Sequence, residues 1–428
     1  MGDGADITLS AERKLGDRIA RELYRDPDYL EDPVLDEYLQ NIWQPLVKGA
    51  QARGELSPEL QERFAWKILI GRDRSVNAFA LPGGYLGIHL GLISVVTTRD
   101  ELASVMAHEL SHVTQRHISR SMGDQARMTP WLIGAMILGM LAASKSAQGA
   151  QAMIVGGQAM AAQSQLNFSR DMEREADRVG YGIMTEAGFD PRGFVGMFDK
   201  LQQASRLNDN GAYPYLRSHP LTTERIADMQ SRQLTAGSLA PVPTPSLEHA
   251  MMVGRARVLS NPGVDGLRGL LLEADSWPVS APPSMAARHA GVLYAGVLAA
   301  GRLRDDVAAS TYLDRLTALV SSDPVGTRLA RWLRVELSLL AGDWRSAQAQ
   351  LDTRSADDRD AVQMRRPELL LRGQLALQSG MCTWPAAPAL PWRAGAASPE
   401  RTSPRGICCC LTAAAGVPTP HWAPMAPA

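Results

Sequence analysis

The string His108-Glu-Leu-Ser-His112 constrains this chain more than any other feature, because it sets two imidazoles four residues apart. Residues four apart lie on one face of an α-helix, so both rings can bind a single metal ion. A helix start is predicted just upstream, where Thr98-Arg-Asp-Glu101 has the form of a capping box. The pattern also occurs by chance, so alone it is half a metal site that needs a further ligand.

Any further ligand must be a histidine or a carboxylate, because the first 381 residues contain no cysteine. The four cysteines, Cys382 and Cys408 to Cys410, all lie in the last 48 residues. Neutral imidazoles suit Zn²⁺, which in catalytic sites keeps three protein ligands and leaves one position for water. Glu109 lies beside a ligand and can act as the general base toward that water. We predict one zinc ion per chain; the alternative is an exposed helix that carries two histidines.

A second predicted helix, over 169–177, contains four acids, three of which are candidate ligands: Glu173, Glu175 and Asp177. Glu173 and Asp177 are four residues apart and share a face, whereas Glu175 points about 160° away from Glu173. We therefore predict that Glu173 is the third zinc ligand and that Asp177 orients a ligand imidazole through its other ring nitrogen. Gly180 lies on the same face and allows close packing against the first helix. The alternative is a solvated acidic helix.

The region before the first motif predicts helices and then strands. Apolar residues at helical spacing between 9 and 46 predict two helices. Extended patterns at 64–70, 76–80 and 85–90, with a turn at 82–84, predict a small antiparallel sheet. Segment 76–80 is either an ordinary paired strand or an edge strand to which an extended substrate adds.

Charge and hydropathy limit the partners. The formal net charge of −1 gives no global reason to expect nucleic acid or an anionic membrane as a partner. The longest apolar stretch, 130–143, is shorter than the roughly 20 residues that a membrane-spanning helix needs. Residues 130–166 are either a pair of packed helices or a mobile or membrane-apposed lid, and peripheral membrane contact is expected, if at all, through residues 130–162.

A third motif, Ser218-His219-Pro220 followed by Arg225, completes an ordered set. Together with the other two it resembles the M48 family of metallopeptidases. This resemblance implies a zincin-type fold and peptide-bond hydrolysis. It implies zinc on His108, His112 and Glu173, catalysis by Glu109 and Asp177, and two roles for His219, which closes the zinc site in a latent state and, once withdrawn, stabilises the oxyanion with Arg225. The other histidines near the motif, His89 and His117, are expected to be structural or surface groups.

The resemblance also implies a setting. We expect a periplasmic endopeptidase in the quality control of misassembled outer-membrane proteins, with unfolded proteins as substrates and the outer-membrane assembly machinery as a possible partner. The alternative is a latent metalloprotein that acts as a chaperone or scaffold. Periplasmic relatives begin with a signal peptide, whereas the first residues here are polar. We expect that the start site is misassigned.

The expected fold class is α+β. Residues 1–240 form a mainly helical peptidase domain with a small antiparallel sheet. Residues 241–380 are rich in Ala and Leu at helical spacing, and similar helix endings recur about every forty residues, which predicts an all-α domain of tetratricopeptide-like repeats. Residues 381–428 are rich in Pro and Cys and predict an aberrant or disordered tail that replaces further repeats.

Overall fold

The computed structural model describes the chain in segments, which cover residues 7–123, 170–206, 212–235, 246–278, 282–352 and 366–378. Contacts divide the chain into two compact units, Met1–Leu337 and Ser338–Ala428. The segment 130–166, predicted to be either packed helices or a lid, and the predicted tail at 381–428 lie outside the described residues.

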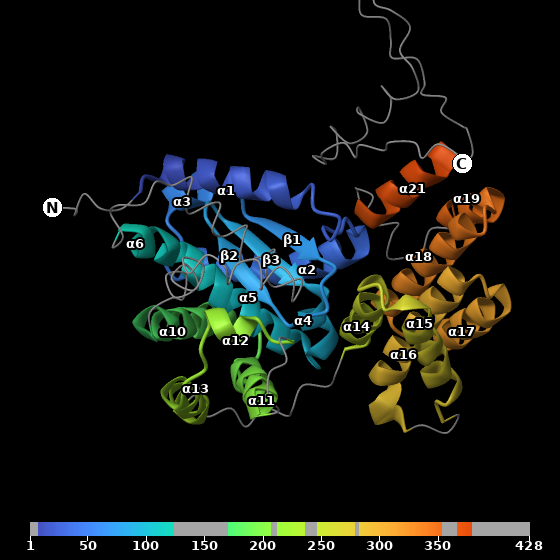
Figure 1. Ribbon diagram of the computed structural model, residues 1–428. Helices are drawn as coiled ribbons and strands as arrows, with labels where there is room; N and C mark the ends of the chain where they lie inside the picture. The colour runs from blue at the N-terminus through green and yellow to red at the C-terminus, as the bar shows by residue number, and fades with distance from the viewer. Residues whose placement is uncertain are drawn as a thin grey trace, which may run out of the picture. The chain divides into compact units, whose positions relative to one another are not determined.

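The first unit is mainly helical with one small sheet, which confirms the predicted α+β class (Figure 1). Its elements up to the first motif are α1 (Leu9–Leu23), α2 (Pro33–Ala52), α3 (Pro58–Arg63), β1 (Lys67–Gly71), β2 (Ala78–Leu81), β3 (Tyr85–His89), α4 (Leu90–Val95) and α5 (Arg99–Thr114). Those that follow are α6 (His117–Gly123), α10 (Arg170–Glu186), α11 (Arg192–Arg206), α12 (Tyr215–Ser218), α13 (Thr223–Thr235), α14 (Leu247–Leu259), α15 (Gly263–Asp275), η1 (Pro283–Met285), α16 (Ala286–Leu303), α17 (Asp306–Leu319) and α18 (Pro324–Leu340), whose last turn crosses into the second unit.

The three strands lie in the order β1-β3-β2 and form a mixed sheet. β3 is antiparallel to β2 across a turn in which Gly83 and Gly84 have φ values of 75° and 84°, but it is parallel to β1. The predicted antiparallel sheet is therefore wrong for β1. The residues after β1 do not close a hairpin: Arg72 N–H donates to the Asp28 carbonyl at 2.8 Å, and the Asp73 carbonyl accepts from Gly91 N–H at 2.9 Å.

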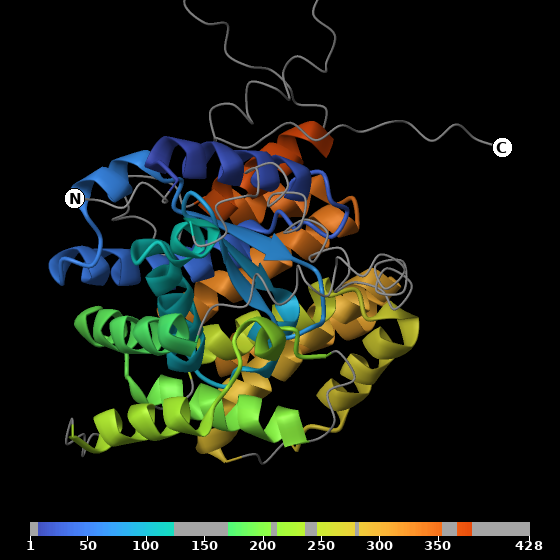
Figure 2. The ribbon, with the colours of Figure 1, turned by 60° about the vertical axis from the view of Figure 1, so that its left-hand side comes forward.

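Helix α5 lies at the centre of the first unit. The capping box predicted at its start is present, with Thr98 and Glu101 bonding each other's backbone N–H groups. Every residue from Glu101 to Thr114 is buried, and Figures 1 and 2 show α1 and α5 on opposite sides of the sheet. α10 approaches α5 closely at Gly180, where a Cβ would lie 3.1 Å from the Ala107 carbonyl. The close helix packing predicted at Gly180 is confirmed.

Helix α14 belongs to the first unit, although the sequence places it beyond the predicted boundary at 240. Arg255 of α14 is 4 % exposed and bonds both carboxylate oxygens of Asp32, the N-cap of α2, at 2.8 and 2.6 Å. A second carboxylate, that of Glu336, lies 3.1 Å from the same guanidinium. The predicted domain boundaries at 240 and 380 remain predictions. The contacts within the structure divide the chain after Leu337 instead.

His249, also on α14, should make the stability of the protein depend on pH. Its Nδ1 accepts from the Tyr38 hydroxyl at 2.7 Å and its Nε2–H donates to the Val96 carbonyl at 3.1 Å. Burial lowers the pKa of His249 below 6.5, although the bond to Val96 opposes this. The unfolded chain therefore binds a proton at a higher pH than the folded one, and the stability present above about pH 6.5 is lost as the pH falls through the folded pKa.

We expect the free energy of unfolding of the wild type to fall below pH ~6.5 more steeply than that of His249→Gln. The difference in slope should reach at most about 1.4 kcal/mol per pH unit, the value for one proton. Urea unfolding at a series of pH values measures both slopes. Parallel curves for the two proteins would contradict the role given to His249.

The described part of the second unit is helical, with α19 (Trp344–Asp352) and α21 (Arg366–Gln378) after the end of α18. Arg372 joins them through contacts of 3.1 Å to Asp352 and 3.0 Å to Glu368. The predicted helical C-terminal region is thereby confirmed, while the tetratricopeptide-like repeat remains a prediction. Among the described helices, none has both the length and the apolar character to cross a membrane.

Candidate metal centre

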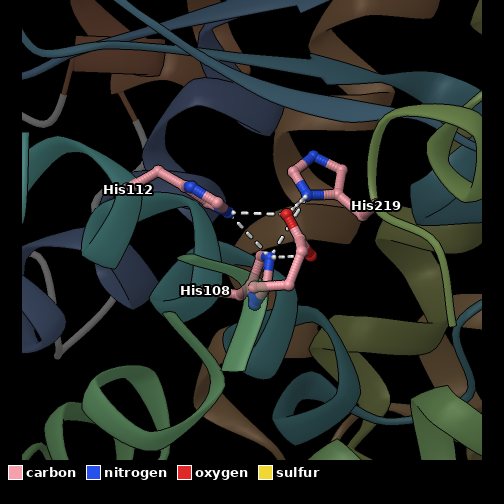
Figure 3. Close-up of side chains that lie close together, drawn as sticks. His108, His112 and His219 are labelled. Atoms are coloured by element: carbon pink, nitrogen blue, oxygen red, sulfur yellow. Dashed lines mark hydrogen bonds and ion pairs between the residues drawn. The ribbon is translucent and has the colours of Figure 1, made fainter. Parts of the chain in front are cut away.

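Four buried side chains from three parts of the chain converge at one point. α5 carries His108 and His112 on one face, α10 brings Glu173, and His219 directly follows α12; Figure 3 labels the three histidines. One donor atom from each lies within 4.8 Å of the others, and each residue is at most 2 % exposed. The structure thus brings together all four residues that the sequence nominates as metal ligands.

The spacing of the donor atoms suits a tetrahedral ion. His108 Nε2 lies 3.0 Å from His112 Nε2, 3.3 Å from His219 Nδ1 and 3.4 Å from Glu173 Oε2. Glu173 Oε1 lies 3.5 Å from His112 Nε2 and 3.0 Å from His219 Nδ1. Ligands held about 2.0–2.1 Å from one zinc ion in tetrahedral geometry lie about 3.3–3.4 Å from each other. These contacts, which use both oxygens of Glu173, are 3.0–3.5 Å long and lie close to that spacing, so three imidazoles and one carboxylate suit a metal ion such as Zn²⁺.

Asp177 and Arg225 form a charged layer behind His108 and Glu173. Asp177 Oδ1 accepts from His108 Nδ1 at 2.9 Å, as expected of a group that orients this ring. Arg225 donates to both oxygens of Asp177 at 2.7 and 2.8 Å and lies 2.9 Å from Glu173 Oε2. The Thr222 hydroxyl caps the start of α13 by accepting from Arg225 N–H at 3.3 Å. This guanidinium therefore holds two carboxylates in place.

The charges of this layer keep the carboxylates ionised. Burial alone would raise the pKa of Asp177, but the hydrogen bonds and the positive charge of Arg225 lower it below its ordinary value. The pKa of Glu173 is likewise held well below the ordinary value, because the neighbouring His219 and His108 outweigh the effect of burial. Both side chains present negative charge to a cation at neutral pH.

Glu109 lies beside the donor atoms and contacts the edge of the sheet. Its Oε2 accepts from the backbone N–H of Ala80 on β2 at 2.9 Å, and its Oε1 lies 3.4 Å from His219 Nε2. The ring of His219 therefore faces the donor cluster with Nδ1 and Glu109 with Nε2. Tyr215 stacks on this ring, with centroids 4.6 Å apart.

His117 is the residue near this site whose contacts the sequence did not reveal. It is fully buried, and its Nδ1 lies 2.9 Å from His112 Nδ1. Its Nε2 lies 3.0 Å from Glu175, the acid predicted to point away from the cluster. The one signal in the sequence is that His117 follows His112 by five residues. In the structure Arg116, just past the end of α5, has a φ of 54° and turns the chain there. His89 is also buried, and its Nδ1 lies 3.0 Å from the Ser75 hydroxyl, outside the cluster.

Comparison with known proteins gives a consistent result. Residues 33–233 match the family model described as peptidase family M48. The chain is 37 % identical to the "Putative beta-barrel assembly-enhancing protease" of Vibrio cholerae over 258 residues. This alignment covers 59 % of this chain and 50 % of that protein. Over 281 residues the chain is 34 % identical to the "Beta-barrel assembly-enhancing protease" of Escherichia coli, covering 65 % and 54 %.

More distant similarity extends to the "Mitochondrial metalloendopeptidase OMA1" of Arabidopsis thaliana, with 26 % identity over 237 residues, 55 % of this chain and 42 % of that protein. The chain spans about half the length of the bacterial relatives it matches. The matched range 33–233 contains every residue of the candidate metal centre.

Proposed function

Residues 33–233 of this chain belong to peptidase family M48, and from this premise we propose that the chain is an endopeptidase that uses one zinc ion. The observation that carries the proposal is the convergence of His108, His112 and Glu173 beside Glu109. His108, His112 and Glu173 would hold the zinc ion, which would supply positive charge to polarise a peptide carbonyl and to make water more acidic. The family match, the donor spacing and the ionised carboxylates all support this assignment.

The residues around the donor atoms have separate roles in the proposed hydrolysis. Glu109 is the general base: Oε2 is held by Ala80, whereas Oε1 is buried without a hydrogen bond among the described residues and can take a proton from water. Asp177 fixes the ring of His108. Arg225 holds Asp177, and to stabilise an oxyanion with His219, as the family implies, it would have to leave Glu173.

The substrate is proposed to lie along β2. This strand is at one end of the order β1-β3-β2, and the Ala80 N–H on it points to Glu109. An extended peptide added to this edge would run past the general base, with backbone hydrogen bonds that select little for sequence. Unfolded segments fit such a site, since they expose backbone that can pair.

His219 is proposed to close the site at rest. Its Nδ1 stands with the donor atoms and its Nε2 lies near Glu109, so one ring occupies the position for water and also faces the base. The loop that carries it leaves α12 and returns into α13, and the Pro220 carbonyl accepts a hydrogen bond from Arg225 Nη1 at 2.9 Å. Removal of this ring should open the site.

His219→Ala is therefore expected to raise the rate of casein cleavage above that of the wild type by at least about tenfold, the effect of about 1.4 kcal/mol. The measurement uses zinc-loaded protein. The double variant His219→Ala/Glu109→Gln is the control and should be inactive, because it lacks the base. If neither the wild type nor His219→Ala cleaves while both bind unfolded protein, the scaffold or chaperone alternative is correct and the peptidase proposal fails.

The setting is proposed from the relatives. Two of them are named for enhancing β-barrel assembly. We propose that this chain acts in the periplasm on misassembled outer-membrane proteins, with its C-terminal helices guiding substrates or the assembly machinery. The run of helices α15 to α17 within the first unit supports this, because stacked helices can present extended binding surfaces.

A further inference from the structure

A chain of three hydrogen-bonding groups extends from His112 away from the donor cluster. His112 Nδ1 lies 2.9 Å from His117 Nδ1, His117 Nε2 lies 3.0 Å from Glu175 Oε2, and the same oxygen lies 2.8 Å from Arg120 Nη1. His117 is fully buried, whereas the side chains of Glu175 and Arg120 are 38 % and 44 % exposed. The inner contact is therefore shielded from water and the outer contact is not.

The two facing Nδ1 atoms permit only certain proton positions. One nitrogen must carry the proton and the other must accept it. If His112 uses Nε2 toward the donor cluster, that nitrogen has no proton, so Nδ1–H is the donor. His117 must then accept at Nδ1 and carry its own proton on Nε2, which is the atom that faces Glu175. This one arrangement of protons satisfies the contacts from His112 to His117, from His117 to Glu175 and from Arg120 to Glu175.

The arrangement parallels the one behind the other α5 histidine. His108 uses Nε2 toward the cluster and gives its Nδ1–H to Asp177, which Arg225 holds. His112 uses Nε2 toward the cluster and faces His117, whose Nε2 contacts Glu175, and Arg120 in turn holds Glu175. The acceptor is a carboxylate in the first case and a neutral imidazole in the second. Groups of this kind fix the tautomer and orientation of a ligand ring.

We propose that His117 is a positioning residue that sets the tautomer and orientation of His112 for zinc, with Glu175 fixing the tautomer of His117 in turn. The proposal rests on the proposed zinc site. Its test does not need proteolysis, so its failure can be told apart from failure of the peptidase assignment. Glu175 is solvent-exposed, and its share of the effect is expected to be small.

The test compares two replacements of His117 by zinc titration against a chromophoric chelator. His117→Leu fills the space without an acceptor and should weaken zinc affinity by about 10–100-fold. His117→Asn places an amide oxygen near the Nδ1 position and should recover most of that loss. Glu175→Gln retains an acceptor and should change affinity by less than about threefold, in keeping with the small contribution of exposed ion pairs.

His89→Leu is the matched control, since it removes another buried histidine whose Nδ1 contact is to Ser75 rather than to a ligand. It should lower stability and leave zinc affinity unchanged. Equal affinity in wild type, His117→Leu and His117→Asn, or equal loss in both replacements with the metal-free melting temperature preserved, would overturn the proposal.

A spectroscopic readout covers the case in which His117→Leu fails to fold. In zinc-loaded wild type labelled with ¹⁵N-histidine, long-range ¹H–¹⁵N correlations should show the proton of His112 on Nδ1 and the proton of His117 on Nε2. The spectrum of His117→Asn identifies the His117 signals by their loss. If the proton of neutral His117 were found on Nδ1, the proposed positioning role of His117 would be refuted directly.

Discussion

Glu109→Gln is expected to lower kcat/KM for cleavage of an unfolded protein by about 10²–10⁴-fold, the usual contribution of a general base. The amide that replaces the carboxylate cannot take a proton from water. Its oxygen can still accept from Ala80 N–H, the bond that holds the native side chain at 2.9 Å, so the edge of the sheet should keep its place. The rate is best compared in the His219→Ala background, where the ring near Glu109 is absent.

Metal content separates loss of the base from loss of the site. Glu109 is not among the four clustered donors, so zinc bound per chain should be nearly unchanged in Glu109→Gln. Glu173→Gln serves as the comparison, because it alters a donor and should lower both zinc content and activity. Equal cleavage by Glu109→Gln and its parent would reject the hydrolytic mechanism.

Arg255→Leu is expected to destabilise the first unit by about 3–5 kcal/mol, the cost of breaking a buried ion pair by removing one partner. Asp32 is 7 % exposed and would lose both of its bonds to the guanidinium, while Glu336 would lose a contact of 3.1 Å. Chemical denaturation measures the loss of stability. A two-state fit gives the change in the free energy of unfolding, and where the transition is not two-state the denaturation midpoint should be lower than that of the wild type.

The same helix provides a matched control. Arg257 pairs with Glu273 at 2.7 Å, but both side chains are about one-third exposed, at 36 % and 31 %. Arg257→Leu should therefore cost no more than about 1 kcal/mol. Adding Asp32→Asn to Arg255→Leu should restore part of the stability, since the amide oxygen can still cap α2 and the unpaired charge of Asp32 is removed. Equal effects of the two arginine replacements would contradict a structural role for α14.

Local patterns were sufficient for the helices that carry the site. Thr98 and Glu101 cap α5 through bonds between residues three apart, and the spacing of His108 and His112 puts both rings on one face. In the same way the spacing of Glu173 and Asp177 aims both acids toward α5, while Glu175 faces elsewhere. These relations depend on helix geometry alone, which is why they can be read without a fold.

Strand order and long-range ion pairs could not be obtained in this way. β1 runs parallel to β3, and the residues after it bond to Asp28 and Gly91 rather than closing a hairpin; nothing in the strand sequence encodes that choice. Arg255 and Asp32 are 223 residues apart, so their contact, which brings α14 into the first unit, has no local signal. Pairing between distant segments is decided by packing of the whole chain.

The sequence by itself determined which side chains could serve as metal donors, which carboxylate was the candidate base, and which helices carry them. Only the tertiary structure decided how these groups are held. It placed the Nδ1 atom of His219 among the donors and its Nε2 3.4 Å from Glu109 Oε1, and it turned the chain at Arg116 so that His117 lies against His112. Helical periodicity fixes directions within one element, whereas the approach of separate elements depends on contacts that no short sequence pattern contains.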